Sequence, residues 1–174
     1  MSSKVISITS LLIFFLSANL KAQSRKSQKD ADKQTIEWRY ELEVVGQGVQ
    51  GTYQVKVWSY SKDVNTATEQ AKKNAVHGII FRGFTGAGRL QGQRPLTNNP
   101  NLENEKAEFF KDFFASGGKY LKFVTLANHG AIGAGDAIKV GKEYKVGVVI
   151  SVNTSELRKD LENAGIIKSL SAGF

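Results

Sequence analysis

The chain has 174 residues, of which 41% are hydrophobic and 23% are charged, and its formal net charge is +8. This length suits one domain with a sizeable core rather than two. Because the chain has no cysteine, the composition excludes disulfides, thiolate zinc sites, a cysteine nucleophile and a lipid anchor on a lipobox cysteine.

The first 22 residues predict a cleaved secretory signal peptide. Lys4 gives a positive start, the apolar run Val5 to Leu20 follows, and Ala22 offers a small residue before Gln23. The strongly apolar part is short for a membrane span, which favours a signal peptide over the alternative, an uncleaved anchor. No later stretch is apolar enough to span a bilayer, so we expect no transmembrane segment after cleavage.

Residues 23–34 are polar and basic and show no apolar periodicity. We expect them to form a mobile N-terminus, followed by a single domain over residues 35–174. Loss of the two signal-peptide lysines leaves a charge of +6. In an exported protein this charge favours anionic lipid, cell-wall polymer or an acidic protein over nucleic acid, although solubility alone also accounts for it.

Two strands joined by a glycine-rich connection are predicted next. Apolar and polar residues alternate over residues 35–45 and again over residues 52–60. Gly46, Gly48 and Gly51 match G-x-G-x-x-G, but the dinucleotide-binding fingerprint needs a helix after the glycines. A strand follows instead, so we interpret the glycines as a hairpin connection and expect no cofactor.

A helix with a face of small residues is predicted to follow the hairpin. Ala67, Ala71 and Ala75 recur every four residues, and this spacing lets one helix face lie close to a sheet. Thr66 and Glu69 have the spacing of a capping box, which predicts that the helix starts at Thr66.

The middle of the chain is less regular. Residues 79–81 fit either the end of the helix or a short buried strand. Residues 82–100 hold four glycines and both prolines, so we predict a long loop, either functional or mobile. A second helix is expected over residues 101–115, with an aromatic face that either packs into the core or forms a ridge for a partner: Phe109, Phe110, Phe113 and Phe114.

The last third returns to strands and ends in a helix. Its glycine-rich loop contains both His129 and Asp136. The final helix is expected to begin between Asn153 and Ser155, with Leu157, Leu161 and Ala164 as its apolar face. The predicted order is a strand over residues 119–127, a loop over 128–136, a short strand over 138–140, a long strand over 144–152, and this helix.

Strands joined by short turns argue for an antiparallel sheet, and each strand alternates, which leaves one buried face. We therefore predict an α+β fold. It is a two-layer sandwich in which two to three helices pack on one face of an antiparallel sheet of about four to five strands.

The histidines offer little catalytic chemistry. His77 falls inside the first helix, where a lone histidine is more often a surface or partly buried residue than a catalyst. His129 shares a glycine-rich loop with Asp136, a pairing compatible with a general base or a metal ligand. No third ligand is suitably spaced, and H-E-x-x-H and G-x-S-x-G are absent.

Two further groups of residues are candidates for binding. Arg82, Arg89 and Arg94 lie in the long loop and have the chemistry to hold an anion. Trp58 and Tyr60 lie on the polar face of the second strand. Two interpretations stay open for these aromatics: they stack on a sugar or fill a partner's pocket, or a loop or helix covers them.

Three segments carry a resemblance to a known group: Tyr40 to Gly51, Tyr53 to Ile80, and Tyr144 to Ile166. They resemble the N-terminal domain of flagellar assembly protein T and related small outer-membrane lipoprotein domains. The resemblance implies a compact α+β, non-enzymatic envelope module with an assembly or structural role. The chain departs from this group in lacking the lipobox cysteine and in its loop over residues 82–100. The resemblance assigns no catalytic residues.

We therefore expect an exported, non-enzymatic protein of the periplasm or cell envelope of a Gram-negative bacterium. It would act as a structural, assembly or binding module whose partner is another envelope protein or a cell-wall component, not nucleic acid. We assign no catalytic, cofactor-binding or metal-binding residue. The alternative is a small ligand-binding protein or enzyme with its site in the glycine-rich loops around His129 and Arg82–Arg94. The expected binding surface draws on Trp58, Tyr60, Arg82, Arg89, Arg94, His129 and Asp136.

The signal-peptide interpretation makes a direct prediction about the mature chain. Cleavage after Ala22 should leave Gln23 at the N-terminus, because the signal ends at this small residue. Intact-mass measurement of the exported protein checks this, and a mass that still includes Met1 to Ala22 would instead support the anchor.

Overall fold

The computed structural model describes residues 25–33, 37–49 and 51–169. The predicted signal peptide lies outside these ranges. Residues 25–33 are helical, which the sequence analysis did not predict. The other elements are β1 (Tyr40–Gln47), β2 (Thr52–Ser61), α2 (Val64–Phe81), α3 (Leu102–Glu105), α4 (Ala107–Phe113), η1 (Lys119–Phe123), β3 (Val124–Leu126), η2 (Ala127–Gly130), β4 (Ala137–Val140), β5 (Glu143–Asn153) and α5 (Thr154–Asn163).

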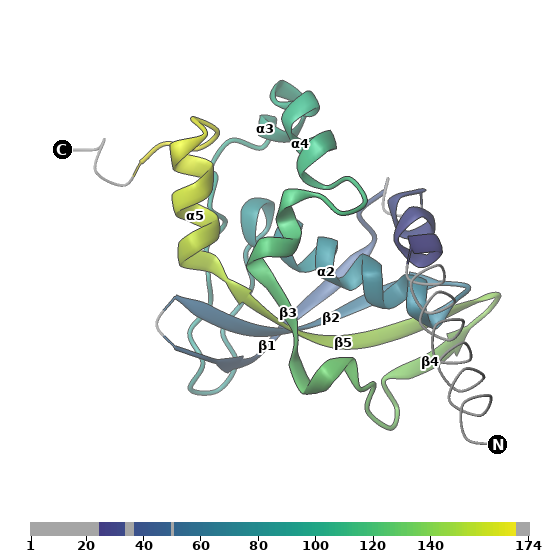
Figure 1. Cartoon of the computed structure of the whole chain (residues 1–174). Helices are drawn as coiled ribbons and strands as arrows, with labels where there is room; N and C mark the ends of the chain where they lie inside the picture. Colours follow the sequence, from purple (N-terminus) through teal and green to yellow (C-terminus); the bar gives the residue numbers. More distant parts are fainter. Residues whose placement is uncertain (1–24, 34–36, 50, 170–174) are drawn as a thin grey trace, which may run out of the picture.

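The strands form one antiparallel sheet in the order β1-β2-β5-β3, and β4 also pairs with β5. Helices α2, α4 and α5 gather on one side of this sheet, as Figure 1 shows. The α+β class and the antiparallel sheet are thus confirmed. Within the part of the chain that the structure describes, no helix is both long and apolar enough to cross a membrane.

The glycine-rich connection joins two strands, as predicted. Strands β1 and β2 pair with a bulge between Val44 and Gly46, and Gly51 has a φ of 81°, where a side chain would be strained. The first strand is shorter than predicted. The backbone of Trp38 has a φ of 43°, which turns the chain out of an extended path, so β1 begins only at Tyr40.

Helix α2 confirms the predicted small-residue face and corrects the predicted start. Ala67, Ala71 and Ala75 are all fully buried. The N-cap is Asp63 rather than Thr66: the backbone N–H of Thr66 donates to Asp63 Oδ1 at 2.8 Å. Asp63 is the better cap because its carboxylate also accepts from the Thr66 hydroxyl. The helix runs on to Phe81, which excludes a strand over residues 79–81.

Two predictions for the middle of the chain are wrong. The helix expected over residues 101–115 is split into α3 and α4 at Lys106, whose φ of −116° and ψ of 34° are not helical. The strand expected from residue 119 begins with the 3₁₀ helix η1 instead. Tyr120 and Phe123 are both buried, and residues three apart face the same side in a 3₁₀ turn but opposite sides in a strand.

The C-terminal elements β4, β5 and α5 lie where they were predicted. Leu157 and Leu161 are buried, but Ala164 is exposed and does not belong to the apolar face. Helix α5 ends before Ala164, which is its C-cap, and Gly165 follows with a φ of 65°. The chain then turns back, and Ile166 and Ile167 enter the core.

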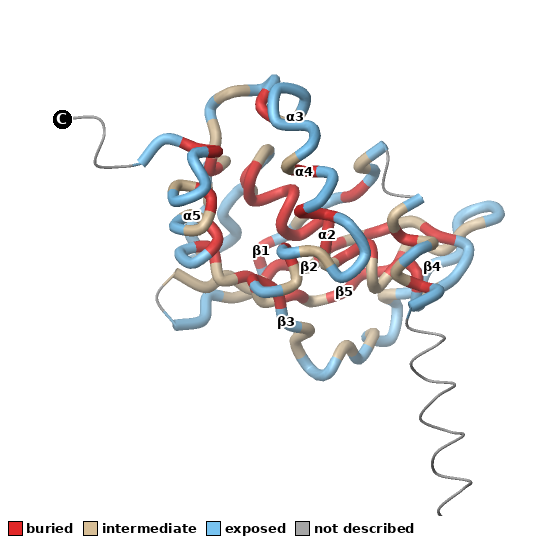
Figure 2. The backbone as a smooth tube through the Cα atoms, turned by 45° about the horizontal axis from the view of Figure 1, so that its top comes forward, coloured by how far each residue is buried: buried red, intermediate tan, exposed pale blue. Residues whose placement is uncertain are grey.

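The core lies between the sheet and the helices and continues above α2. Figure 2 shows buried positions along α2 and the central strands. The rings of Phe110 and Phe114, on and after α4, contact Phe81 and His77 of α2, with centroids 5.1 Å and 6.0 Å apart. The aromatic face of residues 109–114 therefore packs into the core, as one of the two predicted alternatives proposed.

Close packing of α2 on the sheet predicts that a larger side chain destabilises the protein more on the alanine face than beside it. Ala71→Leu should lower the free energy of unfolding by about 1–3 kcal/mol, because a fully buried alanine face has no room for three extra carbons. Thr68, which is only half-buried, should tolerate Thr68→Gln with a smaller loss. Chemical denaturation of both variants measures the difference, and equal losses would contradict close packing.

Candidate functional site

Helix α2 has a second buried face, and its side chains are polar. Gln70, Lys73 and His77 are each no more than 3% exposed and recur at helical spacing. Buried polar groups need partners, because leaving one unpaired costs free energy. The partners of Lys73 and His77 come from segments far away in the sequence, and they mark the first candidate site.

His77 links β1 to α3. The hydroxyl of Tyr40 lies 2.7 Å from His77 Nδ1, and Glu103 Oε2 lies 3.3 Å from Nε2. A carboxylate only accepts hydrogen bonds, so Nε2 carries the proton and Tyr40 donates to Nδ1. Burial lowers the pKa of His77, and the Glu103 carboxylate opposes this shift. The imidazole is therefore neutral near pH 7.

Trp38 closes this cluster from the side of β1. Its ring stacks on His77 with centroids 3.7 Å apart, and its Nε1 donates to Glu103 Oε1 at 2.8 Å. Arg82 Nη2 donates to the Trp38 carbonyl at 2.9 Å. These contacts hold Trp38 in its left-handed backbone conformation, which a tryptophan adopts only where its surroundings impose it.

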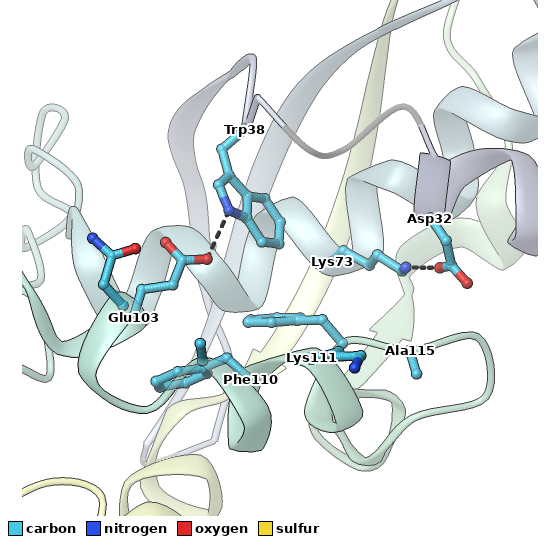
Figure 3. Close-up of a pocket in the computed structure, with 10 residues that line it drawn as sticks. Asp32, Trp38, Lys73, Glu103, Phe110, Lys111 and Ala115 are labelled. Carbon is cyan, nitrogen blue, oxygen red and sulfur yellow. Dashed lines mark hydrogen bonds and ion pairs between the residues drawn. The ribbon is translucent and has the colours of Figure 1, made fainter.

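A cleft of about 620 Å³ opens beside this cluster (Figure 3). Its walls come from the helical segment over residues 25–33, from α2, α3 and α4, and from Trp38. Aromatic rings and alanines supply the apolar part, while two lysines and two carboxylates supply the charge. The lining residues are Asp32, Trp38, Lys73, Glu103, Asn104, Ala107, Phe110, Lys111, Phe114 and Ala115.

Lys73 is the buried cation of the cleft. Its side chain is 3% exposed and forms an ion pair with Asp32, and its ammonium lies 5.7 Å from the centre of the Tyr120 ring. Burial lowers the pKa of Lys73 to about 8. The segment over residues 25–33 is thus tied to the domain, and Ala31 within it is fully buried.

The second candidate site is the face of the sheet opposite the helices. Trp58 and Tyr60 of β2 lie side by side there and are half-buried. Trp58 Nε1 donates to Glu43 at 3.0 Å, and the Tyr60 hydroxyl donates to Glu41 at 2.9 Å. These half-buried rings are surrounded by charged side chains, and binding through them stays a proposal.

Cations complete this polar network. Lys145 reaches across β2 to Glu41, with Nζ 2.9 and 2.8 Å from the two carboxylate oxygens. Hydrogen bonding by Lys145 lowers the pKa of Glu41, and the same contact raises the pKa of Lys145. The guanidinium of Arg39 lies 4.4 Å from the centre of the Tyr60 ring, a distance at which cation–π attraction stabilises the pair.

The Trp58 ring lies flat against the sheet, over Gly147 of β5. A Cβ placed on Gly147 would lie 2.9–3.0 Å from three carbons of that ring. The near-equal distances mean that the ring covers Gly147 face-on. Only glycine permits this approach, and one face of the indole is left pointing away from the sheet.

The structure separates the other predicted site residues. Arg82 and Arg94 line a groove of about 470 Å³ beside Tyr40, and neither His129 nor Asp136 lines it. Arg89 is exposed. His129 is exposed with a φ of 55°.

Asp136 is bound elsewhere, because it forms a 2.7 Å ion pair with Lys56 at the margin of the sheet face. Among the described residues, no group of three or more histidine, aspartate or glutamate side chains is arranged to hold a metal ion.

Sequence reasoning missed the cleft and most of its residues. The spacing of Gln70, Lys73 and His77 was visible, but polar side chains on one face of a helix ordinarily indicate solvent. Asp32 and Glu103 come from segments that no sequence pattern places beside α2. Only the tertiary arrangement brings them together.

Comparison of the chain with protein-family models, curated proteins and solved structures found no match. The resemblance to the flagellar assembly protein T domain therefore stays a prediction.

The buried His77 predicts a pH dependence of stability. The pKa of His77 in the folded state lies below the ordinary value of 6.5. At a pH between these two pKa values, the unfolded chain therefore binds one proton more than the folded chain. Lowering the pH from 7.5 to 5.5 should therefore reduce the free energy of unfolding, by at most about 1.4 kcal/mol per pH unit.

Denaturant titrations across this pH range measure the slope. His77→Gln should flatten it, because the amide does not titrate, whereas His129→Gln should leave it as in the wild type. An unchanged slope in His77→Gln would show that another group causes the dependence.

Proposed function

We propose that the protein is an exported envelope module that binds cell-wall glycan on the open face of its sheet. The observation that carries this proposal is the Trp58 ring held flat over Gly147, with Tyr60 beside it on the same strand. A flat aromatic surface complements the apolar C–H face of a sugar ring. The predicted signal peptide and the predicted resemblance to envelope domains support the same role.

The polar groups around the rings suit the rim of a sugar. Sugar hydroxyls both donate and accept hydrogen bonds, and this face offers both kinds of partner. Glu41 and Glu43 accept, whereas Lys56 and Lys145 donate. In the free protein the two ammonium groups lie 5.1 and 5.0 Å from the centre of the Trp58 ring. Their long, flexible stems let them move aside and bind hydroxyls when a sugar stacks there.

Glycan binding on this face predicts that the protein loses affinity for glycan when the Trp58 ring is removed. Trp58→Ala should weaken cosedimentation with purified, protein-free peptidoglycan by at least about tenfold, as expected for a central aromatic contact. Phe109→Ala is the matched control, because it removes a partly buried aromatic of α4 outside this face. Urea denaturation should show that both variants fold.

Gly147→Ala gives a sharper test, since it keeps the tryptophan but pushes its ring off the sheet. Its affinity should fall toward that of Trp58→Ala, and urea denaturation should show that the variant still folds. Wild-type protein that does not sediment with peptidoglycan, or a Gly147→Ala variant with full affinity, would contradict the proposal and favour a protein partner.

A further inference from the structure

The cleft beside Lys73 is separate from the proposed glycan surface and shares no residue with it. Its volume of about 620 Å³ falls within the range of small-molecule sites, which are mostly apolar with a few placed polar groups. Figure 3 shows the Trp38 and Phe110 side chains along its walls and Lys73 directed toward Asp32. Phe114 adds a third ring.

The charges that line the cleft differ in how firmly they are held. Glu103 already accepts from Trp38 and lies within hydrogen-bond distance of His77. Lys111 is largely exposed, and its Nζ lies 3.7 Å from Oε2 of Glu108. Lys73 is buried, and a buried ammonium needs an anion close by. Its carboxylate partner, Asp32, has a side chain that is 30% exposed.

We propose that the cleft binds a small apolar carboxylic acid, whose carboxylate replaces Asp32 at Lys73. The apolar body of this ligand lies against Trp38, Phe110 and Phe114. Asp32 then acts as an internal competitor that neutralises Lys73 while the cleft is empty.

Lys73 keeps a carboxylate partner throughout the exchange, so no buried charge is left unpaired. The water that Asp32 regains offsets the water that the ligand carboxylate gives up, so the net gain comes from the apolar body of the ligand. The ligand removes apolar surface from water along the aromatic walls, which Asp32 does not do. An uncharged molecule of the same shape removes the same apolar surface but cannot pair with Lys73, so only the charged ligand competes with Asp32.

Isothermal titration calorimetry with 2-naphthoate and its uncharged analogue, 2-naphthalenemethanol, tests this inference. The wild-type protein should bind naphthoate, and the preference for naphthoate over the alcohol should be larger in Asp32→Asn than in the wild type. Asp32→Asn should bind naphthoate at least about tenfold more tightly than the wild type does, because the competing carboxylate is gone. Its affinity for the alcohol should not change. Asp30→Asn, in the same segment, is the matched control and should behave as the wild type.

The double variant Asp32→Asn/Lys73→Met guards against unfolding, because it leaves neither member of the pair charged. The preference for naphthoate over the alcohol should disappear in it, with the fold confirmed by circular dichroism. Equal binding of both probes by the wild type and Asp32→Asn would overturn the proposal and make the ion pair a structural tether. A preference that persists in the double variant would overturn it as well. Peptidoglycan binding should not respond to either variant, which keeps this test separate from that of the sheet face.

Discussion

Helix α2 is enclosed on two sides, and the positions of the other elements depend on this enclosure. Its alanine face lies on the sheet, where Ala67, Ala71 and Ala75 are fully buried. Its opposite face carries Lys73 and His77 and is covered in turn by Trp38, α3, α4 and the segment over residues 25–33. A helix buried on both sides has to find partners for its polar groups inside the protein. The cover over α2 is therefore made of groups that pair with it, not of apolar side chains alone.

Helices α2, α4 and α5 lie on one side of the sheet, so the opposite face of the sheet is left to its own side chains. Long residues cover it: Lys145 crosses β2 to reach Glu41, and Arg39 lies over Tyr60. Exposed ion pairs of this kind contribute little to stability. Their effect here is to orient two aromatic rings that would otherwise be free to rotate. The buried polar face of α2 thus forms the first candidate site, and the oriented side chains on the open face of the sheet form the second.

Sequence periodicity predicted those elements whose spacing of apolar residues fits only one type of secondary structure. Strand β2 alternates without interruption, and Ala67 and Ala71 can only be a packed helix face. It failed where a local pattern was overridden by distant contacts. Trp38 continued the alternation of β1, but its stacking on His77 and its hydrogen bond to Glu103 turn the chain there. The cleft was beyond reach for the same reason, because Asp32 and Lys73 are paired by tertiary structure and by no motif.

Strand β1 connects the two candidate sites, and its register decides whether either exists. Tyr40 points to His77 on the helical side, while its neighbour Glu41 binds Tyr60 and Lys145 on the open side. A shift of one residue would exchange these faces and destroy both networks. The pairing of β1 with β2 sets this register, and in it Leu42 lies so close to Gly78 of α2 that a Cβ on Gly78 would lie 2.0 Å from Leu42 Cδ1. Gly78 therefore leaves room for Leu42, and the alternation of β1 presents one set of side chains to the cluster around His77 and the other to the open face.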